Sequence, residues 1–471
     1  MFDSFNVMQI SLKSLDLPNF GISKTQPKIK SQIYIERLRK FKNDLKKNNI
    51  ESAIIYADRE HFANMHYLTG FDPRFEEALL IINNSEDASY LITGPENQGY
   101  ANISEIDLIK KNFPTFGLLG QNRENSLSLE DIFFECNLKK NKNCGVVGWK
   151  YFVSHEFNKP DKIFDIPNYI LNSITKVVGD ISRLKNITPW FMHSSNGYRS
   201  KNEIDEIAFF EFSSCHTSES LKNVLSNIKP GMTEYDVAAF YQPIGIPLSC
   251  HMMFSSGERA KLGLASPSSK ILKLGEPFAA AYGVWGALNC RVGWIANNEK
   301  DLPHDTKDYF EKLVVPYFKA VKAWYENLAI GVEGGLIFKK VMNILSDPFF
   351  GVYLNPGHLI HRDEWMNSPI YKNSKEKIFS GQAFQMDIIP ATNTNYFSAN
   401  LEDGVVILDK KDREIFKDKY PEEMERLNKR REFIINQIGI NLNPEVMPLS
   451  NIPCYLSPFI LNFSKVVVAS N

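Results

Sequence analysis

The sequence predicts two α/β or α+β domains in one chain of 471 residues. In the first 180 or so residues, strand-length apolar runs alternate with helical patterns, which is typical of an α/β unit. Proline, glycine, serine and asparagine then accumulate between residues 180 and 200, as they do in linkers. The length itself suits about two to three domains. We therefore divide the chain into an N-terminal arm (1–29), a first domain (30–185), a second domain (196–440) and a C-terminal tail (441–471).

The first domain opens after an arm that lacks sustained periodicity and could extend to a neighbouring subunit. The stretch "YIERLRKFKNDLKKN" (34–48) places apolar residues three to four apart, which predicts an amphipathic helix. Strand-like apolar runs follow, and "DLIKKNFP" (107–114) is expected to belong to a helical crossover. The runs predicted as strands are "SAIIYA" (52–57), "ALLIIN" (78–83) and "ASYLITG" (88–94).

The second domain begins with a long helical pattern over residues 200–228. Ser200 and Asn202 are candidate N-caps for this helix, and "KPGMT" ends it. Thr233 and Asp236 then predict a capping box at the start of another helix. Strand-like and helix-like runs alternate to about residue 437, and prolines punctuate the tail.

The composition argues against several classes of partner. Lys plus Arg number 54 and Asp plus Glu 55, so a net charge of -1 gives no drive toward nucleic acid or an anionic membrane. The first residues lack the pattern of a signal peptide, and no stretch reaches the roughly 18 apolar residues of a membrane span. The six cysteines lie far apart without a CxxC pair, which suits reduced, mostly buried thiols. We expect a cytoplasmic protein without nucleic-acid or membrane partners.

A series of motifs resembles one known family. The motifs "RSKNEIDEI", "IKPGMTEYDVAAF", "SSGERA", "NPGHLIHRDEW", "SGQAFQMDIIP" and "NLEDGVVILD" occur in this order in the second half, and "DREHFANMHYLTGFDPRFEEALLI" in the first. Over about residues 30–415 the chain resembles the pita-bread fold family, which includes aminopeptidase P, prolidase, methionine aminopeptidase and creatinase. The resemblance implies an α/β N-terminal domain of the creatinase type, an α+β pita-bread C-terminal domain that holds the active site, and a homodimer.

Peptidases of this family hold two metal ions with two aspartates, one histidine and two glutamates, and the resemblance assigns these positions here. His358 matches the histidine and Glu402 matches the last glutamate. The other glutamate falls on Ile389, with Asp387 two residues upstream as a substitute. The aspartates fall in "FAAAYGVWGALNCRVGW" (278–294), which contains no carboxylate; their places lie near Ala281 and near Leu288 or Asn289.

These departures argue against a dinuclear metal site. Each Mn or Co ion takes about five to six donors, which one histidine and one matched carboxylate cannot supply. The proton-shuttling histidine of the peptidases is also missing, since Gly263 and Leu264 stand there and the nearest imidazole is His251. Creatinase is similar in fold and hydrolyses a C–N bond without metal. We therefore predict no metal and no other cofactor, with His358, Glu402, His251 and Glu364 as catalytic residues.

The segment "GHLIHRDEW" (357–365) contains the densest cluster of titratable groups. If it is extended, His361, Asp363 and Trp365 share one face and form part of a binding site. Glu364 is the counterpart of a His–Glu pair that the family keeps here. The competing interpretation is a surface turn in which Arg362 pairs with a carboxylate.

Further predicted substrate-binding residues lie on or near the stretch without carboxylates. Arg291 matches an arginine of the family, and a structural ion pair is an equally good interpretation of it. Cys290 beside it is considered as a nucleophile, but no feature of the sequence pairs it with a histidine. The full predicted substrate-binding set is His361, Arg291, Tyr282, Trp285 and Asp387.

The leading functional hypothesis is a metal-independent, creatinase-like hydrolase that cleaves a C–N bond in a small nitrogenous metabolite. One alternative is a catalytically inactive relative that serves in binding or assembly. The other is an Xaa-Pro aminopeptidase or dipeptidase with a rearranged metal site.

Overall fold

A computed structural model describes residues 9–470 of the chain. The described residues form two compact units: the N-terminal unit, Ile29–Arg199, and the C-terminal unit, which combines the residues up to Lys28 with those from Ser200 onward. The first eight residues of the predicted arm, and residue 471 of the predicted tail, lie outside the described part. None of the helices between residues 9 and 470 has the length and apolar character that crossing a membrane requires.

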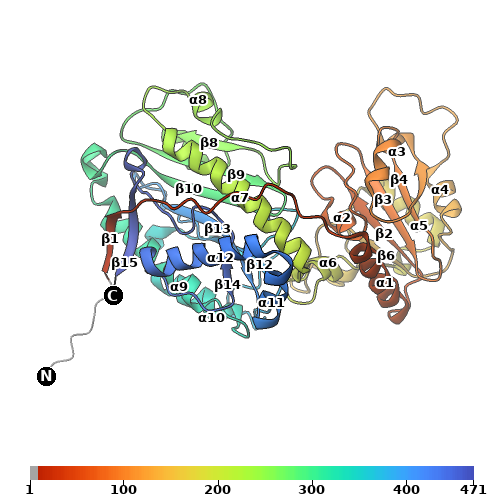
Figure 1. Ribbon diagram of the computed structural model, residues 1–471. Coiled ribbons are helices and arrows are strands. Elements are labelled where there is room, and N and C mark those ends of the chain that lie inside the picture. Colours follow the sequence, from red (N-terminus) through yellow and green to blue (C-terminus); the bar gives the residue numbers. More distant parts are fainter. Residues whose placement is uncertain (1–8, 471) are drawn as a thin grey trace. The chain divides into compact units, whose positions relative to one another are not determined.

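The N-terminal unit is built on a six-stranded mixed sheet in the order β5-β4-β3-β2-β6-β7 (Figure 1). Strands β2, β3 and β4 are antiparallel neighbours, whereas β6 runs parallel to β2 and β5 runs parallel to β4. Apolar residues of β2 and β3 pack against helices α4 and α5 in one core. The strands are β2 (Ser52–Ala57), β3 (Ala78–Asn83), β4 (Ser89–Thr93), β5 (Ile109–Asn112), β6 (Cys144–Val147) and β7 (Leu184–Asn186); the helices are α1 (Ser31–Lys47), α2 (Ala63–Thr69), α3 (Asn97–Tyr100), α4 (Leu129–Glu135), α5 (Asn168–Val178) and α6 (Pro189–Met192).

The local patterns of this unit predict most of its elements. Strands β2 and β3 coincide with the predicted runs, and β4 and α1 differ from the predicted ranges by a few residues at their ends. The prediction of a helical crossover at 107–114 is wrong, because Ile109–Asn112 forms the edge strand β5. This strand is mostly exposed, so no apolar alternation marks it in the sequence. Its pairing with β4 decides its conformation.

The C-terminal unit contains a seven-stranded sheet whose central path is β11-β12-β13-β10-β9-β8, with β14 also paired to β13 (Figure 1). All pairs along this path are antiparallel. The strands are β8 (Met253–Ser256), β9 (Glu276–Val284), β10 (Ala287–Ile295), β11 (His358–Leu359), β12 (Ala383–Asp387), β13 (Asn400–Ile407) and β14 (Val446–Pro448); the helices are α7 (Ile204–Asn227), α8 (Glu234–Ala238), α9 (Val315–Asn327), α10 (Gly334–Ile344), α11 (Lys410–Lys419) and α12 (Pro421–Phe433), with π-helical turns at Phe310–Val314 and Ile434–Ile438.

The first two helices of this unit test the capping predictions. Helix α7 begins at Ile204 with Glu203 at its N-cap, so Ser200 and Asn202 do not cap it. The amide of Asn202 instead donates to the carbonyl of Gly381, which ties the entry of α7 to the strand region. The predicted capping box of α8 is confirmed, because Thr233 and Asp236 bond reciprocally.

Helix α7 also carries a fully buried carboxylate. Glu211 forms a bidentate pair with Arg426, with distances of 2.9 and 2.8 Å, and lies 2.9 Å from Nη2 of Arg430. Both arginines come from α12. Burial raises the pKa of Glu211, but the two guanidinium groups outweigh it, so its pKa lies below the ordinary value. The cluster therefore joins α7 and α12 through a buried ion pair, and removal of either partner would strongly destabilise the fold.

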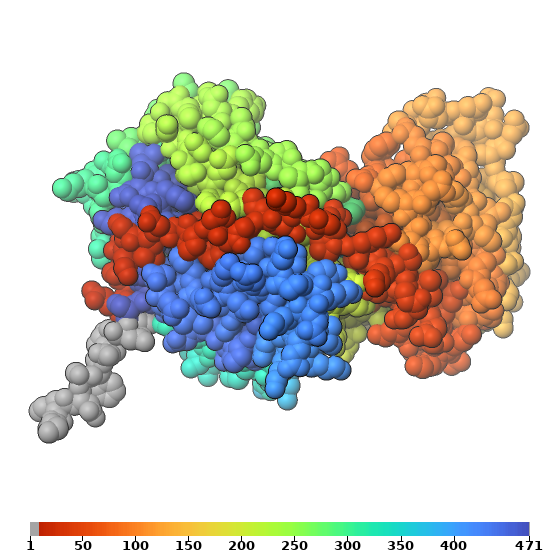
Figure 2. Space-filling view, in the orientation of Figure 1, coloured from red at the N-terminus to blue at the C-terminus, as the bar shows by residue number. Residues whose placement is uncertain are grey.

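The described part of the predicted arm binds to its own chain. Gln9–Ser14 (β1) pairs antiparallel with Lys465–Ser470 (β15). Beyond β1 the segment runs over the surface of the C-terminal unit, as the red band in Figure 2 shows. The amide of Asn451 donates to the carbonyl of Gly21, and the phenol of Tyr455 donates to that of Leu15. The predicted tail supplies these partners, and much of it is buried in the unit.

Candidate functional site

Four neighbouring strands of the C-terminal unit place one side chain each in a row. Ala281 of β9 lies opposite Cys290 of β10, Cys290 lies opposite Glu402 of β13, and Glu402 lies opposite Asp387 of β12. Residues directly opposite each other in antiparallel strands project to the same face of the sheet. The row therefore holds two carboxylates on one side and two uncharged side chains on the other. All four residues line a cavity of about 430 Å³.

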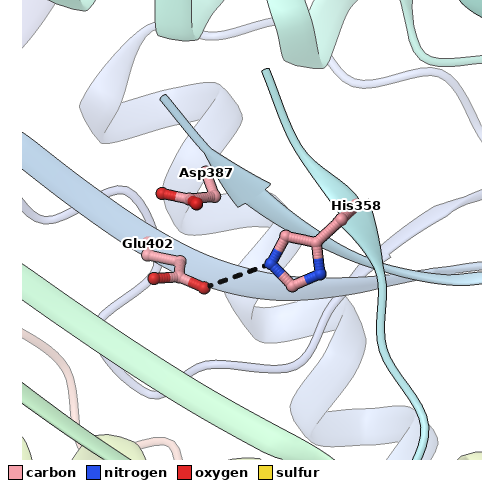
Figure 3. A group of neighbouring side chains, drawn as sticks. All are labelled: His358, Asp387 and Glu402. Carbon is pink, nitrogen blue, oxygen red and sulfur yellow. Dashed lines mark ion pairs between the residues drawn. The ribbon is translucent and has the colours of Figure 1, made fainter. Parts of the chain in front are cut away.

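His358 enters this site because of the glycine that precedes it. Gly357 has a φ of +101°, and a Cβ there would lie 2.8 Å from the carbonyl oxygen of Gln385. Only glycine fits such a bend without strain. His358 then pairs with Gln385, two residues before Asp387 on β12, and its side chain is completely buried. His358, Asp387 and Glu402 converge from three strands (Figure 3).

The imidazole of His358 is contacted on one face of its ring and at both of its nitrogens. Trp365 stacks on the ring, with centroids 4.0 Å apart and an interplanar angle of 19°. Nδ1 lies 3.2 Å from the carbonyl oxygen of Leu359, which favours a proton on Nδ1 and directs Nε2 toward the carboxylates. Nε2 lies 3.1 Å from Oε1 of Glu364 and 3.8 Å from Oε1 of Glu402, as ion pairs rather than aligned hydrogen bonds.

The protonation of the cluster departs from that of free side chains. Burial lowers the pKa of His358, but Glu364 and Glu402 outweigh it, so the pKa lies well above its usual range. Burial raises the pKa of Asp387 to about 6. The charge of His358 opposes this shift, and the charge of Glu364 adds to it. Burial and the neighbouring Asp387 raise that of Glu402 well above normal. The site can thus hold both an imidazolium and a protonatable carboxylate near neutral pH.

The rest of the cavity is mostly apolar. Its wall is formed by β9 and β10, which contribute Ala279 to Ala281, Leu288 and Val292 to the lining. Such a wall excludes water and strengthens electrostatic interactions at the carboxylates. Lys261 is the cationic side chain among the described lining residues, and it is ion-paired with Glu258 at 2.8 Å.

The residues do not fit the two metal ions that the resemblance implies. Ala281 and Cys290 complete the row beside Glu402, so the strands β9 and β10 supply uncharged side chains where a second pair of carboxylates would have to stand. The residues do fit one ion: one donor atom each from His358, Asp387 and Glu402 lie within 4.8 Å of one another. A nitrogen and two carboxylate oxygens could hold one divalent cation, with other positions left for water or substrate.

Of the predicted site residues, His358, Glu402, Glu364 and Asp387 lie together. Arg291 does not join them, because it faces the other side of β10 from Cys290 and Val292. Its buried Nη2 donates to both carboxylate oxygens of Asp403, at 2.9 and 2.8 Å, and Nη1 donates to the main-chain oxygen of Glu402 at 3.1 Å. The structural interpretation of Arg291 is the one that this geometry supports.

The two predicted aromatic residues also lie outside the lining of the cavity. Tyr282 follows Ala281 on β9, so strand alternation turns it away, and its ring lies 5.2 Å from that of Tyr241. Trp285 stands in the turn between β9 and β10 and packs against a core cluster that includes Phe209 and Phe210. Both residues support the wall from behind rather than contact its interior.

The two other predicted histidines are placed elsewhere. His251 is exposed, and its Nε2 lies 2.7 Å from the carbonyl oxygen of Leu264. His361 is buried 3.3 Å from Glu206, and Arg362 shares that carboxylate at 3.5 Å. The structure brings neither histidine into the lining of the cavity.

The segment that contains His361 is not extended. The amide of His361 donates to the carbonyl of Asp363, so the chain turns tightly there. Period-two alternation therefore fails, and Trp365 stacks on His358 instead of sharing a face with His361. The competing interpretation anticipated the turn and the ion pair of Arg362, although this pair is buried rather than at the surface.

Sequence reasoning missed Asn400, which lines the cavity beside Asp387. The available signal was alternation: Asn400 precedes Glu402 by two residues on the same strand, so both face the same side. The motif "NLEDGVVILD" begins with Asn400, but only its glutamate was assigned to the site.

Comparisons with known proteins bear on the fold. No protein-family model matches the chain, and no curated protein matches it. Among solved structures, the prolidase from Thermococcus sibiricus is 16% identical, with a TM-score of 0.62 over 80% of this chain and 95% of that one. Dipeptidase PepE from Mycobacterium ulcerans is 14% identical, with a TM-score of 0.60 over 81% and 95%. X-Pro aminopeptidase from Thermotoga maritima is 16% identical, with a TM-score of 0.58 over 79% and 95%.

These likenesses span nearly the whole of each relative, and at such low identity they establish the fold. The chain has the predicted fold, an α/β N-terminal domain of the creatinase type and an α+β pita-bread C-terminal domain, which it shares with prolidases and aminopeptidases P.

Proposed function

We propose that the chain is a hydrolase that cleaves a C–N bond of a small nitrogenous substrate without a metal ion. The observation that carries this proposal is the buried imidazole of His358 beside Glu364 and Glu402, at the edge of an apolar cavity. An imidazole and carboxylates in a dry site can move a proton in both directions along a reaction path.

In the proposed mechanism, Glu402 takes a proton from a water molecule whose oxygen attacks the carbon of the C–N bond. The imidazolium of His358 donates its Nε2 proton to the nitrogen, which leaves as an amine when the bond breaks. The proton on Glu402 then passes to His358, 3.8 Å away, and restores the starting state. Glu364 holds the imidazolium in place at 3.1 Å. The raised pKa of Glu402 supports its role as a base at neutral pH.

The experiment that tests this mechanism measures release of amine or ammonia from a panel of small amides, ureas and amidines. We expect His358→Gln and Glu402→Gln to lower kcat by about 100-fold or more, since each removes a proton-transfer step. The matched controls are His304→Gln and Glu414→Gln, which change exposed residues of the same types. Hydrolysis that survives both site variants would contradict the mechanism, and an absence of any turnover would favour the inactive relative.

A second candidate function rests on the convergence of His358, Asp387 and Glu402. A divalent ion bound there would polarise an amide carbonyl and activate a water molecule. The solved structures with this fold include an Xaa-Pro dipeptidase from Bacillus anthracis and an X-Pro aminopeptidase. The corresponding activity here would be hydrolysis of Xaa-Pro dipeptides with one metal ion.

Elemental analysis of protein purified without chelators separates the two candidates. The metal-independent mechanism predicts less than stoichiometric metal and turnover that is unchanged by a chelator. One equivalent of Mn, Co or Fe, with Xaa-Pro hydrolysis that the chelator abolishes, would replace it by the second candidate. For either candidate we expect a homodimer, which size-exclusion chromatography with light scattering measures.

A further inference from the structure

We infer that the cavity binds its substrate through a primary ammonium group, which the side chains of Asn400, Asp387 and Glu402 hold. This inference deepens the proposed function and rests on it, because it names the substrate class of the same site. The observation behind it is a set of buried oxygens to which the described protein supplies few or no hydrogen-bond donors.

Asn400 provides the first of these oxygens. Its Nδ2 lies 3.0 Å from the carbonyl oxygen of Ile388 and 3.4 Å from Oδ1 of Asp387. Both neighbours are acceptors, so the amide nitrogen must face them and Oδ1 must point away. Within residues 9–470, Oδ1 of Asn400 accepts no hydrogen bond, although the side chain lines the cavity and is 2% exposed.

The carboxylates of Glu402 and Asp387 provide the other buried oxygens. Oε1 of Glu402 accepts no hydrogen bond from the described residues, and its closest charged neighbour is Nε2 of His358 at 3.8 Å. Asp387 lies directly opposite Glu402 and accepts one long hydrogen bond, at 3.4 Å, from the amide of Asn400. Buried acceptors without donors are unfavourable, and two adjacent buried carboxylates also repel each other. The site is therefore complementary to a positive group with several N–H donors.

The shape of the cavity narrows the ligand further. A primary ammonium has three N–H donors in a compact tetrahedron, whereas a quaternary ammonium has the charge but no donor. Lys261, the cationic lining residue of the described cavity, is already paired with Glu258. Beyond the oxygens, the wall of Ala280, Leu288 and Val292 suits a short hydrocarbon chain. The expected substrate is thus a small primary amine with an apolar body.

Isothermal titration calorimetry at neutral pH with three probes tests this inference. The probes are n-butylammonium, n-butyltrimethylammonium and 1-butanol, which share the chain and differ in charge and donors. We expect n-butylammonium to bind the full-length protein at least about tenfold more tightly than the other two, the difference that one hydrogen bond to a charged group confers. Asn400→Ala should weaken that binding by about tenfold, while Asn227→Ala on α7 leaves it unchanged.

Equal affinities of the three probes for the wild-type protein would overturn the inference, and this comparison needs no variant to fold. Binding of n-butylammonium that Asn400→Ala leaves intact would also overturn it, as would a tightly bound metal ion that excludes the probe. Turnover of a neutral substrate together with equal probe affinities would refute the ammonium site and leave the hydrolase standing. Specific n-butylammonium binding without any C–N hydrolysis would refute the hydrolase and leave the ammonium site standing.

Discussion

The buried pair of Arg291 and Asp403 is the sharpest test of how the candidate site is supported. Their side chains are 3% and 2% exposed. Asp403 also accepts from the main-chain N–H of Cys454 and the amide of Asn289, each at 2.9 Å. Arg291→Met keeps the length of the side chain and removes the charge. It leaves Asp403 buried with two of its four hydrogen bonds gone.

The size of the effect follows from what remains in the core. Removing one partner of a buried ion pair costs about 3–5 kcal/mol, because the other charge stays desolvated. Since the total free energy of unfolding of a protein is about 5–15 kcal/mol, this loss is a large fraction of it. Replacing both partners with apolar residues is often close to neutral. We therefore expect Arg291→Met to lower the free energy of unfolding by about 3–5 kcal/mol, and the double variant with Asp403→Leu to recover at least half of the loss.

Urea denaturation followed by tryptophan fluorescence measures both values, and the double-mutant cycle gives the coupling energy between the two residues. Arg291 also donates to the main-chain oxygen of Glu402, so the single variant should lower turnover. A loss of stability below about 1 kcal/mol, combined with weaker substrate binding, would refute this reasoning. Arg291 would then be a substrate contact, as the other interpretation of the sequence holds.

Three further perturbations probe other parts of the fold and site. The pKa of Glu211 lies below its usual 4.5, so its contribution to stability is present above that pH and is lost as the pH falls through the lowered pKa. Glu211→Gln should therefore lower the free energy of unfolding most at pH 7 and least near pH 3, which urea unfolding at the two pH values measures. Gly357→Ala should destabilise the protein by about 1–3 kcal/mol, and reduce turnover, because the strained backbone displaces His358; an unchanged melting curve would contradict this. Cys290→Asp adds a carboxylate opposite Glu402, so Mn²⁺ should raise its melting temperature but not that of Cys290→Ser.

Short-range patterns in the sequence were enough to predict much of the fold. Strands β2 and β3 form where unbroken apolar runs demand burial on both faces. The capping box of α8 depends on two residues three positions apart, so it is visible without any tertiary information. The order of the motifs led to the family resemblance, and the solved structures confirm the fold that this resemblance implies.

The sequence also identified residues at the centre of the site, through the family resemblance. His358 and Glu402 match motif positions of that family, and the structure brings both into the cavity wall region from β11 and β13. His361 and Arg291 were harder to assign. Their directions depend on a turn and on the register of a strand, and neither follows from residue type.

Taken alone, the sequence determined the order of the elements, the fold that this order matches, and the absence of carboxylates from the stretch 278–294. The tertiary structure decided what that absence means. Strand pairing brings Ala281, Cys290, Glu402 and Asp387 into one row, although more than 100 residues separate its ends. It also leaves Asn400 and Glu402 buried, each with an oxygen to which no described residue donates a hydrogen bond. Register and burial arise from contacts between distant segments, so no local pattern could have revealed them.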